Sequence, residues 1–343
     1  MIYFQCDYAE GCHPRILERL METNMDQTPG YSMDDYCDRA RAKIKAVCGD
    51  ETADVHFLVG GTQTNTTVIA SALRNHQGVL AADTGHIACH ETGAIEATGH
   101  KVLALPNTDG TITGDQVRAY CQAHVNDASF EHMVQPGMVY VSFPTESGTL
   151  YSKEQLTDLS AACKEWGLPL FIDGARLGYG LMSLKNDLTI QEITQLCDVF
   201  YIGGTKCGAL FGEAVVITNE ALKKDFRYSI KQHGGMLAKG RLLGIQFDVL
   251  FEDNLYFEIC KQAVDFALEI RSAFAAKGVP LFGTSETNQQ FVILTEDQRK
   301  AFDGKFAYEV WGPVESGTVV RFCTSWATTR ENVDALLETI AGL

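Results

Sequence analysis

Long apolar runs and positive charge are both scarce in this chain. No apolar stretch approaches the roughly 20 residues that a membrane-spanning helix needs, and the first residues, MIYFQCDYAEGC, lack the basic and apolar stretches of a signal peptide. The 28 Lys and Arg residues are outnumbered by 44 Asp and Glu residues, for a formal net charge of −16. A general nucleic-acid-binding protein is excluded because it needs a basic face to neutralise phosphates. We therefore expect a cytoplasmic protein with no membrane or nucleic-acid partner.

The 11 cysteines form no C-x-x-C pair and no regular framework. In a cytoplasmic chain of this size we expect reduced thiols, mostly buried, rather than a disulfide scaffold. With 343 residues, of which 45% are hydrophobic and 21% charged, the chain is long enough for one large domain, a smaller one and a substantial buried core.

Between about residues 55 and 220, short β-branched apolar runs alternate with helical stretches. This alternation predicts an α/β fold with a mostly parallel central sheet and helices on both faces. Functional sites in such folds lie at the carboxyl ends of the strands. The predicted strands cover residues 55–59, 79–82, 101–105, 138–143, 169–173, 198–204 and 213–218.

The pattern changes after about residue 220. Long amphipathic helical stretches are predicted over 227–250 and 255–277, followed by strand-like runs and a last helix near 330–342. These features indicate a smaller α+β unit. We therefore predict a large domain over residues 1–235 and a small C-terminal domain over residues 236–343.

Two strand ends carry the most informative residues. In FIDGARLG, Asp173 ends a buried strand, where an acid can pair with the protonated ring nitrogen of a cofactor or cap the next helix. About thirty residues later, DVFYIGGTKCG places Lys206 after a Gly-Gly turn. Desolvation there lowers the pKa of a lysine, as imine chemistry requires, although a lone loop lysine is more often an ordinary surface residue. The pairing of the two strands favours the catalytic interpretation.

LVGGTQTN closes a strand with Gly60 and Gly61 and opens a helix at Thr62. Free backbone N–H groups at a helix N-terminus, with hydroxyl groups beside them, suit a phosphate, and a generic glycine turn with a threonine cap is the alternative. The segment is not a Walker A loop, because the GK[ST] ending is absent, and it does not fit G-x-G-x-x-G.

His86 and His90 lie four residues apart, with Glu91 next in the chain. A zinc site of the HExxH type is excluded because Ile87, not Glu, follows the first histidine, and no metal is expected. An imidazole stacked on a flat cofactor, or a packed helix histidine, fits better. Arg321, in VVRFCTSW, has apolar neighbours, so its guanidinium is expected to be partly buried against a carboxylate of a substrate or of the protein.

These segments, taken in order, resemble the low-specificity L-threonine aldolase branch of the β-eliminating lyase family, within the fold-type I enzymes that use pyridoxal 5′-phosphate (PLP). The resemblance runs from Cys6-Asp7-Tyr8 to Arg321, nearly the whole chain. GTKCGALFGEA (204–214) and FIDGAR are its most specific stretches, and HxxxxETGA (86–94) supports them. Each motif alone is modest, whereas the ordered set is specific.

The resemblance implies a cofactor site. Lys206 would hold PLP as a Schiff base, Asp173 would pair with the pyridine nitrogen, and His86 would stack on the ring with Glu91 as its partner. Gly60, Gly61 and Thr62 would cradle the phosphate, with Lys239 or Arg241 from an adjacent subunit as a further phosphate contact.

The resemblance also implies a substrate site and an oligomer. Arg176 would reach the phenolic oxygen of the cofactor and the substrate carboxylate, which Arg321 would hold in a fork, and Asp7 would also contact the substrate. Tyr31, in PGYSMDDY, matches a segment that approaches the site across a dimer interface. A homodimer or a dimer of dimers, that is a homotetramer, follows, with active sites at the interface.

The activity implied is retro-aldol cleavage of L-threonine, L-allo-threonine and similar β-hydroxy-α-amino acids to glycine and an aldehyde. Glu146, in SFPTESG, stands where one subgroup has His, so the base for the β-hydroxyl proton is Glu146, a water that it orients, or the cofactor phosphate. Arg176 is expected to keep this carboxylate ionised. The alternatives are another PLP reaction on the same scaffold, such as β-elimination, racemisation or transamination, and a non-catalytic binding module.

Overall fold

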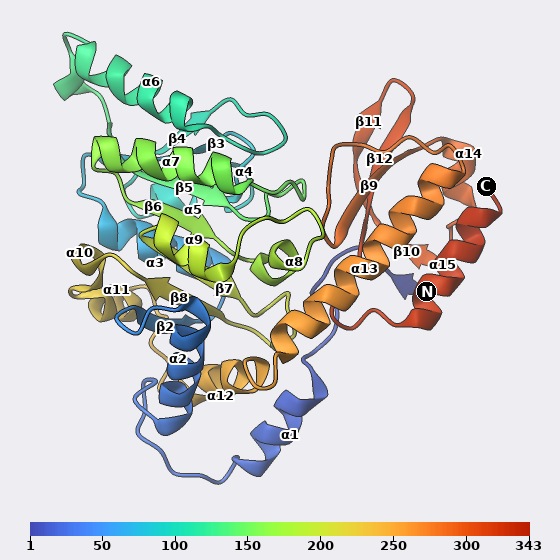
Figure 1. Cartoon of the computed structure of the whole chain (residues 1–343), viewed down its shortest axis with the longest axis horizontal. Coiled ribbons are helices and arrows are strands. Elements are labelled where there is room, and N and C mark those ends of the chain that lie inside the picture. Colours follow the sequence, from blue (N-terminus) through green and yellow to red (C-terminus); the bar gives the residue numbers. More distant parts are fainter.

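Seven short apolar segments form the central sheet of the computed structural model, which describes all 343 residues (Figure 1). The strand order is β2-β8-β7-β6-β5-β3-β4, and only β8 runs antiparallel to its neighbours. The inner strands are covered on both faces, which is why they read as continuous apolar runs. The strands are β2 (Asp54–Leu58), β3 (Gln77–Ala82), β4 (Val102–Leu105), β5 (Gln135–Ser142), β6 (Leu170–Asp173), β7 (Val199–Gly203) and β8 (Glu213–Ile217).

Helices cover both faces of this sheet, each through its own apolar cluster. Three of the covering helices begin with a capping box, in which Thr113, Ser152 or Thr189 accepts from the backbone three residues later; such caps each contribute about 1 kcal/mol. One face carries α3 (Gly61–Ala72), α4 (His86–Cys89), α5 (Ala94–Ala97) and α11 (Phe226–Gln232). The other carries α1 (Pro14–Glu22), α2 (Asp35–Cys48), α6 (Gly114–Asn126), α7 (Lys153–Trp166), α8 (Leu177–Leu181), α9 (Ile190–Leu196) and α12 (Arg241–Leu250).

A smaller unit follows the long helix α13 (Leu255–Ala276), which runs from the large unit into the small one (Figure 1). Its antiparallel sheet has the order β11-β12-β9, and both chain termini lie on this unit. The parallel α/β sheet and the small α+β unit confirm the predicted fold class. The elements are β9 (Gln289–Leu294), α14 (Glu296–Lys300), β10 (Phe306–Ala307), β11 (Glu309–Val314), β12 (Gly317–Cys323) and α15 (Arg330–Ala341).

The predicted strands lie within a few residues of those observed, but the helix predicted over 227–250 is two helices. Residues 233–240 separate α11 from α12, and Gly234 in this break has a φ of 74°, which glycine adopts without strain. The pair Gly234-Gly235 is a turn signal that the predicted single helix passed over. The short elements α10 (Glu220–Lys223) and the 3₁₀ turn Phe130–His132 were not predicted.

Two segments pack across the predicted division between residues 235 and 236. The N-terminal strand β1 (Ile2–Tyr3) pairs with β10, and Phe4 is buried in the apolar cluster of the small unit. Helix α12 packs on α2 of the large unit. The division between residues 235 and 236 stays a prediction, and β1 and α12 are the two segments that pack across it. None of the helices combines the length and the apolar composition that crossing a membrane requires.

Candidate active site

A cavity of about 210 Å³ lies at the carboxyl ends of β6 and β7. Two glycines let these strand ends approach each other. A Cβ atom at Gly174 would collide with the carbonyl oxygen of Tyr201, and one at Gly203 would collide with that of Ala175. The motifs FIDG and IGG therefore place their functional residues on one wall. Of the predicted site residues, Gly60, Gly61, Thr62, His86, Glu146, Asp173, Arg176 and Lys206 line the cavity.

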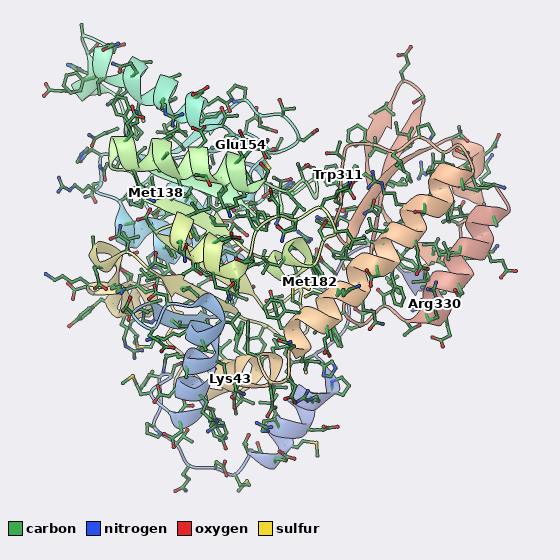
Figure 2. The ribbon with its side chains drawn as sticks, in the orientation of Figure 1. Lys43, Met138, Glu154, Met182, Trp311 and Arg330 are labelled. Atoms are coloured by element: carbon green, nitrogen blue, oxygen red, sulfur yellow. The ribbon has the colours of Figure 1, made fainter.

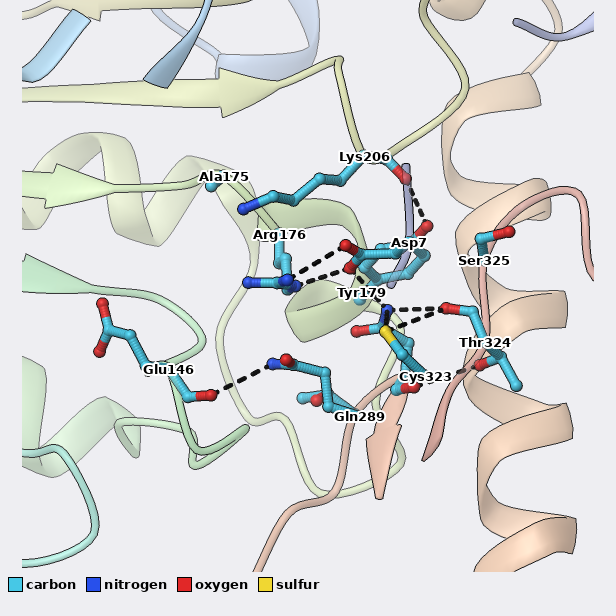
Figure 3. Close-up of polar contacts among 12 residues, drawn as sticks. Asp7, Glu146, Ala175, Arg176, Tyr179, Lys206, Gln289, Cys323, Thr324 and Ser325 are labelled. Atoms are coloured by element: carbon cyan, nitrogen blue, oxygen red, sulfur yellow. Dashed lines mark hydrogen bonds and ion pairs between the residues drawn. The ribbon is translucent and has the colours of Figure 1, made fainter. Parts of the chain in front are cut away.

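Lys206 extends along this cavity, and its amine points into it between Ala175 and Arg176 (Figure 3). The hydroxyl of Tyr179 donates to the Lys206 carbonyl at 2.5 Å and fixes the backbone. Burial, together with the positive charge of Arg176, lowers the pKa of the Lys206 amine. A lysine with a lowered pKa has a larger neutral fraction near pH 7, which is the nucleophilic form.

Asp173 is buried and accepts four hydrogen bonds. Its Oδ2 accepts from the Tyr140 hydroxyl at 2.5 Å and from Asn65 Nδ2 at 3.2 Å. Its Oδ1 accepts from the Tyr201 hydroxyl at 2.6 Å and from the Ala175 amide at 3.0 Å. Burial alone would raise the pKa of Asp173, but the charge of His86 and these bonds lower it. Asp173 therefore stays ionised and suits a protonated ring nitrogen.

Sequence reasoning missed Asn65, Tyr140 and Tyr201. The two tyrosines lie within buried strands, and a tyrosine hydroxyl in such a place needs a partner. That rule indicates that some buried acceptor exists. It does not indicate which one, because the partner comes from a different strand.

His86 lies beside Asp173 and is oriented by Glu91, as predicted for this pair. Its Nδ1 lies 2.7 Å from Glu91 Oε1, which also accepts from Asn65 Nδ2 at 2.7 Å. Burial lowers the pKa of His86, but the bond to Glu91 and the charge of Asp173 outweigh it and raise the pKa. His90 has its ring centroid 5.8 Å from that of His86. No three His, Cys, Asp or Glu side chains gather as a metal site.

Glu146 faces the cavity from the segment after β5. Its Oε1 accepts from the His86 amide at 2.9 Å and from the Ser142 hydroxyl at 2.7 Å. Burial, and after it the charge of Asp173, raises the pKa of Glu146. The expectation that Arg176 keeps this carboxylate ionised stays a prediction.

Arg176 is held by Asp7. Its Nε and Nη2 donate to the two carboxylate oxygens of Asp7 at 2.6 and 3.1 Å. Burial raises the pKa of Asp7, but the charges of Arg176 and Lys206 lower it to about 2. Because Asp7 is fully buried with both oxygens engaged, it does not lie on the cavity wall, and the geometry does not support the predicted contact with substrate. The remaining nitrogen of Arg176 points toward the cavity (Figure 3).

A second, wider cavity of about 460 Å³ adjoins the first and shares His86, Glu146, Arg176 and Lys206 with it. Arg321 and Trp311 line its far wall on the small unit, where Figure 2 shows Trp311. The guanidinium of Arg321 donates to Gln289 Oε1 at 2.6 Å and forms an ion pair with Glu309. Within the chain, the carboxylate that pairs with Arg321 is Glu309, and contact of Arg321 with a substrate carboxylate stays a prediction.

Besides Asp7, three predicted residues lie outside both cavities. Tyr31 is 44% exposed beside Lys231, whose amine is 5.1 Å from its ring centroid. Arg241 donates to the carbonyl oxygens of Thr23 and Asn24, and Lys239 is exposed. A contact of these residues with the site of an adjacent subunit stays a prediction.

The first turn of α3 fits a phosphate group. Gly60 is its N-cap residue and provides no side-chain cap, so the helix presents unbonded N–H groups to the cavity. A Cβ atom at Gly60 would meet no atom within 4 Å, which leaves room for an anion. A lysine with a lowered pKa, an ionised buried aspartate and an uncapped helix N-terminus around one cavity are the groups that PLP requires.

One further acid was missed by sequence reasoning. Glu213, the first residue of β8, is 3% exposed and lines the cavity. Its carboxylate accepts from the Gly204 amide at 2.9 Å and from the Thr205 hydroxyl at 2.8 Å. The signal available was an acid at the start of an apolar strand, in FGEAVVI.

The chain is similar to known proteins over its full length. The family model described as beta-eliminating lyase matches residues 6–297. The low specificity L-threonine aldolase of a Pseudomonas species is 29% identical, over 97% of this chain and 95% of its own length, and that of Pseudomonas aeruginosa is 28% identical over 98% and 96%. The solved structure of Leishmania major threonine aldolase is 44% identical, covers 100% of this chain and 99% of its own, and has a TM-score of 0.96.

Proposed function

Since this chain belongs to the beta-eliminating lyase family, we propose that it cleaves L-threonine, L-allo-threonine and similar β-hydroxy-α-amino acids to glycine and an aldehyde. It is a PLP-dependent carbon–carbon lyase. The observation that carries the proposal is the position of Lys206 opposite ionised Asp173 in one cavity, in a chain similar along its length to threonine aldolases.

Each part of the cofactor would contact a different residue of the cavity wall. Lys206 would take its aldehyde carbon, Asp173 its ring nitrogen, the turn at Gly60 its phosphate, and His86 one face of its ring. When bound, PLP supplies an electron sink for the pair released as the Cα–Cβ bond breaks. The protein contributes orientation and electrostatics.

Two arginines support binding of the substrate carboxylate. The free nitrogen of Arg176 faces the first cavity, and Arg321 lines the second. Asp7 fixes the plane of the Arg176 guanidinium through its two hydrogen bonds. Glu309, paired with Arg321, must yield or share that guanidinium when a carboxylate arrives.

Glu146 is the proposed acceptor of the β-hydroxyl proton, directly or through a water that it orients. It lies on the wall shared by both cavities, between the cofactor residues and Arg321. Its raised pKa makes it a stronger base than an exposed glutamate, and the Ser142 and His86 hydrogen bonds fix its position.

We also propose a cytoplasmic homotetramer, built as a dimer of dimers with active sites at the interface. Support comes from Tyr31, Lys239 and Arg241, which lie away from the cavity of their own chain. Large apolar side chains are also exposed, among them Met21 at 80% and Met25 at 86%, and a subunit interface would bury such side chains. The free cysteines, most of them buried, suit a reducing compartment.

A spectrum and a product assay test the proposal. Purified protein should absorb at about 420 nm, the region of a lysine-bound PLP, and Lys206→Ala should lose this band. L-Threonine and L-allo-threonine should each give acetaldehyde and glycine. A colourless protein that PLP cannot reconstitute, or 2-oxobutyrate as the main product, would contradict the proposal.

A further inference from the structure

Glu213 has no role in the reaction as described, although it is a buried carboxylate on the cavity wall. It lines the same cavity as Gly60, Gly61 and Thr62, the proposed phosphate site. Leu58 is its cross-strand partner in β2, and the chain continues from Leu58 through Val59 to Gly60, the N-cap of α3. Val215 and Tyr201, which share its face of the sheet by strand alternation, pack in the cluster that contains Val68 and Ile69 of α3. Glu213 therefore projects toward the side on which α3 presents its N–H groups.

A carboxylate beside a bound phosphate dianion creates a conflict of like charges. Two anions at close range in a buried site cannot both stay ionised without cost, and a proton relieves the repulsion. Three titratable groups face Glu213: the Lys206 amine from its loop, Asp173 from β6 and the Tyr201 hydroxyl from β7. Only Lys206 is a cation, and it is assigned to the cofactor aldehyde.

The Thr205 hydroxyl cannot donate to a bound phosphate while it donates to Glu213. The single hydroxyl hydrogen of Thr205 is donated to Glu213 Oε1, and its oxygen accepts from the Gly212 amide at 3.0 Å. Thr205 lines the cavity, yet in this arrangement it has no hydrogen to offer an anion. If Glu213 is protonated at Oε1, the bond reverses, and the Thr205 hydrogen becomes available to the cavity.

We propose that Glu213 and Thr205 form a proton-accepting pair at the cofactor phosphate: Glu213 takes one proton from solvent when the phosphate binds, and the Thr205 hydroxyl turns from Glu213 to a phosphate oxygen. This rests on the proposed PLP function. Burial raises the pKa of Glu213 to about 7, so protonation costs little at neutral pH and progressively more above it.

Proton uptake on cofactor binding tests the pair. The apoenzyme is titrated with PLP at pH 8 in buffers of different ionisation enthalpy, and with pyridoxal, which has the aldehyde and ring but no phosphate. Wild type should take up about one more proton per site with PLP than with pyridoxal. ³¹P resonances of the bound cofactor should show that the phosphate itself stays dianionic.

Glu213→Gln separates this residue from other titrating groups. The Gln amide mimics the protonated acid, since its NH₂ can donate to Thr205 Oγ1. The extra proton uptake should disappear, and the PLP dissociation constant of wild type should rise relative to that of E213Q by about tenfold per pH unit above pH 7. Thr205→Ser, which keeps the hydroxyl, is the matched control and should retain the wild-type proton uptake.

The outcomes are distinct. Equal proton uptake with PLP and pyridoxal in wild type, or a proton located on the phosphate, would overturn the proposal without requiring any variant to fold. Parallel pH profiles of wild type and E213Q would overturn it too. PLP binding with any of these results leaves the proposed function standing, whereas no PLP binding at all would overturn both.

Discussion

Glu309 is paired with Arg321, the arginine that a substrate carboxylate is expected to use. Removal of the Glu309 carboxylate should therefore strengthen substrate binding. It lies directly opposite Arg321 in the β11–β12 ladder and forms an ion pair with Nη2 of that residue. The side chain of Glu309 is 40% exposed and that of Arg321 10%. A substrate carboxylate must displace or share this contact, and Glu309→Gln should therefore lower the KM for L-threonine.

The size of the expected fall in KM follows from the solvent exposure of the Glu309 side chain. An ion pair with one partner this open to water is worth about 0.5–1 kcal/mol, which corresponds to a roughly two- to fivefold fall in KM. The value of kcat should change little, because Glu309 lines the second cavity and not the first. Added salt should lower the KM of wild type toward that of the variant, since it screens the same pair.

Steady-state kinetics of acetaldehyde release measure the effect. Glu315→Gln is the matched control, because Glu315 is an exposed acid in the turn of the same hairpin and its removal changes the net charge equally. A KM for E309Q that rises, with E315Q unchanged, would refute the reasoning and would mean that Glu309 orients Arg321 for substrate.

Three further predictions concern the first cavity. Glu146→Gln should lower kcat by about 10²- to 10⁴-fold and remove the acid limb of the pH–rate profile, which in wild type should lie above the usual glutamate pKa because burial raises that of Glu146. Tyr140→Phe removes a donor to ionised Asp173 and should lower the free energy of unfolding by about 1.5–3 kcal/mol, measured by urea denaturation of the apoenzyme. Asp7→Asn should lose about 2 kcal/mol of stability at pH 7, since the pKa of Asp7 falls from 3.8 to about 2 on folding. The depressed pKa stabilises the folded state above about pH 4, and the difference between wild type and D7N should vanish as pH falls toward 2; a difference independent of pH over this interval would contradict it.

The local sequence pattern was enough to locate the strands of the central sheet and the two strand ends that carry Asp173 and Lys206. A parallel strand buried on both faces has to be a short apolar run, and the carboxyl ends of such strands meet at one edge. Asp173 and Lys206 therefore lie on one cavity whatever the details of the loops. The break between α11 and α12 was missed, although the glycines at 234 and 235 are a turn signal in the sequence.

The sequence did not predict which residues the charged side chains of the site pair with. Asp7 and Arg176 are 169 positions apart and form a bidentate ion pair, while Arg321 meets Glu309 through the register of a hairpin. The raised pKa of Glu146 likewise comes from burial, which the sequence around it does not indicate. Each of the two ion pairs joins separate segments of the chain. It forms only where the fold brings the two side chains within a few ångströms of each other.

What the sequence alone determined is the type of chemistry: a lysine after a Gly-Gly turn, an aspartate one strand away, and a glycine turn opening a helix, in fixed order. These follow from backbone geometry, which short motifs encode locally. What only the tertiary structure decided is the charge state and orientation of those groups. The hydroxyls of Tyr140 and Tyr201 help to keep Asp173 ionised, Asp7 fixes Arg176, and Glu213 lines the same cavity as the Gly60 turn. Burial and long-range contacts set these pKa values and hydrogen bonds, and neither exists before the chain is folded.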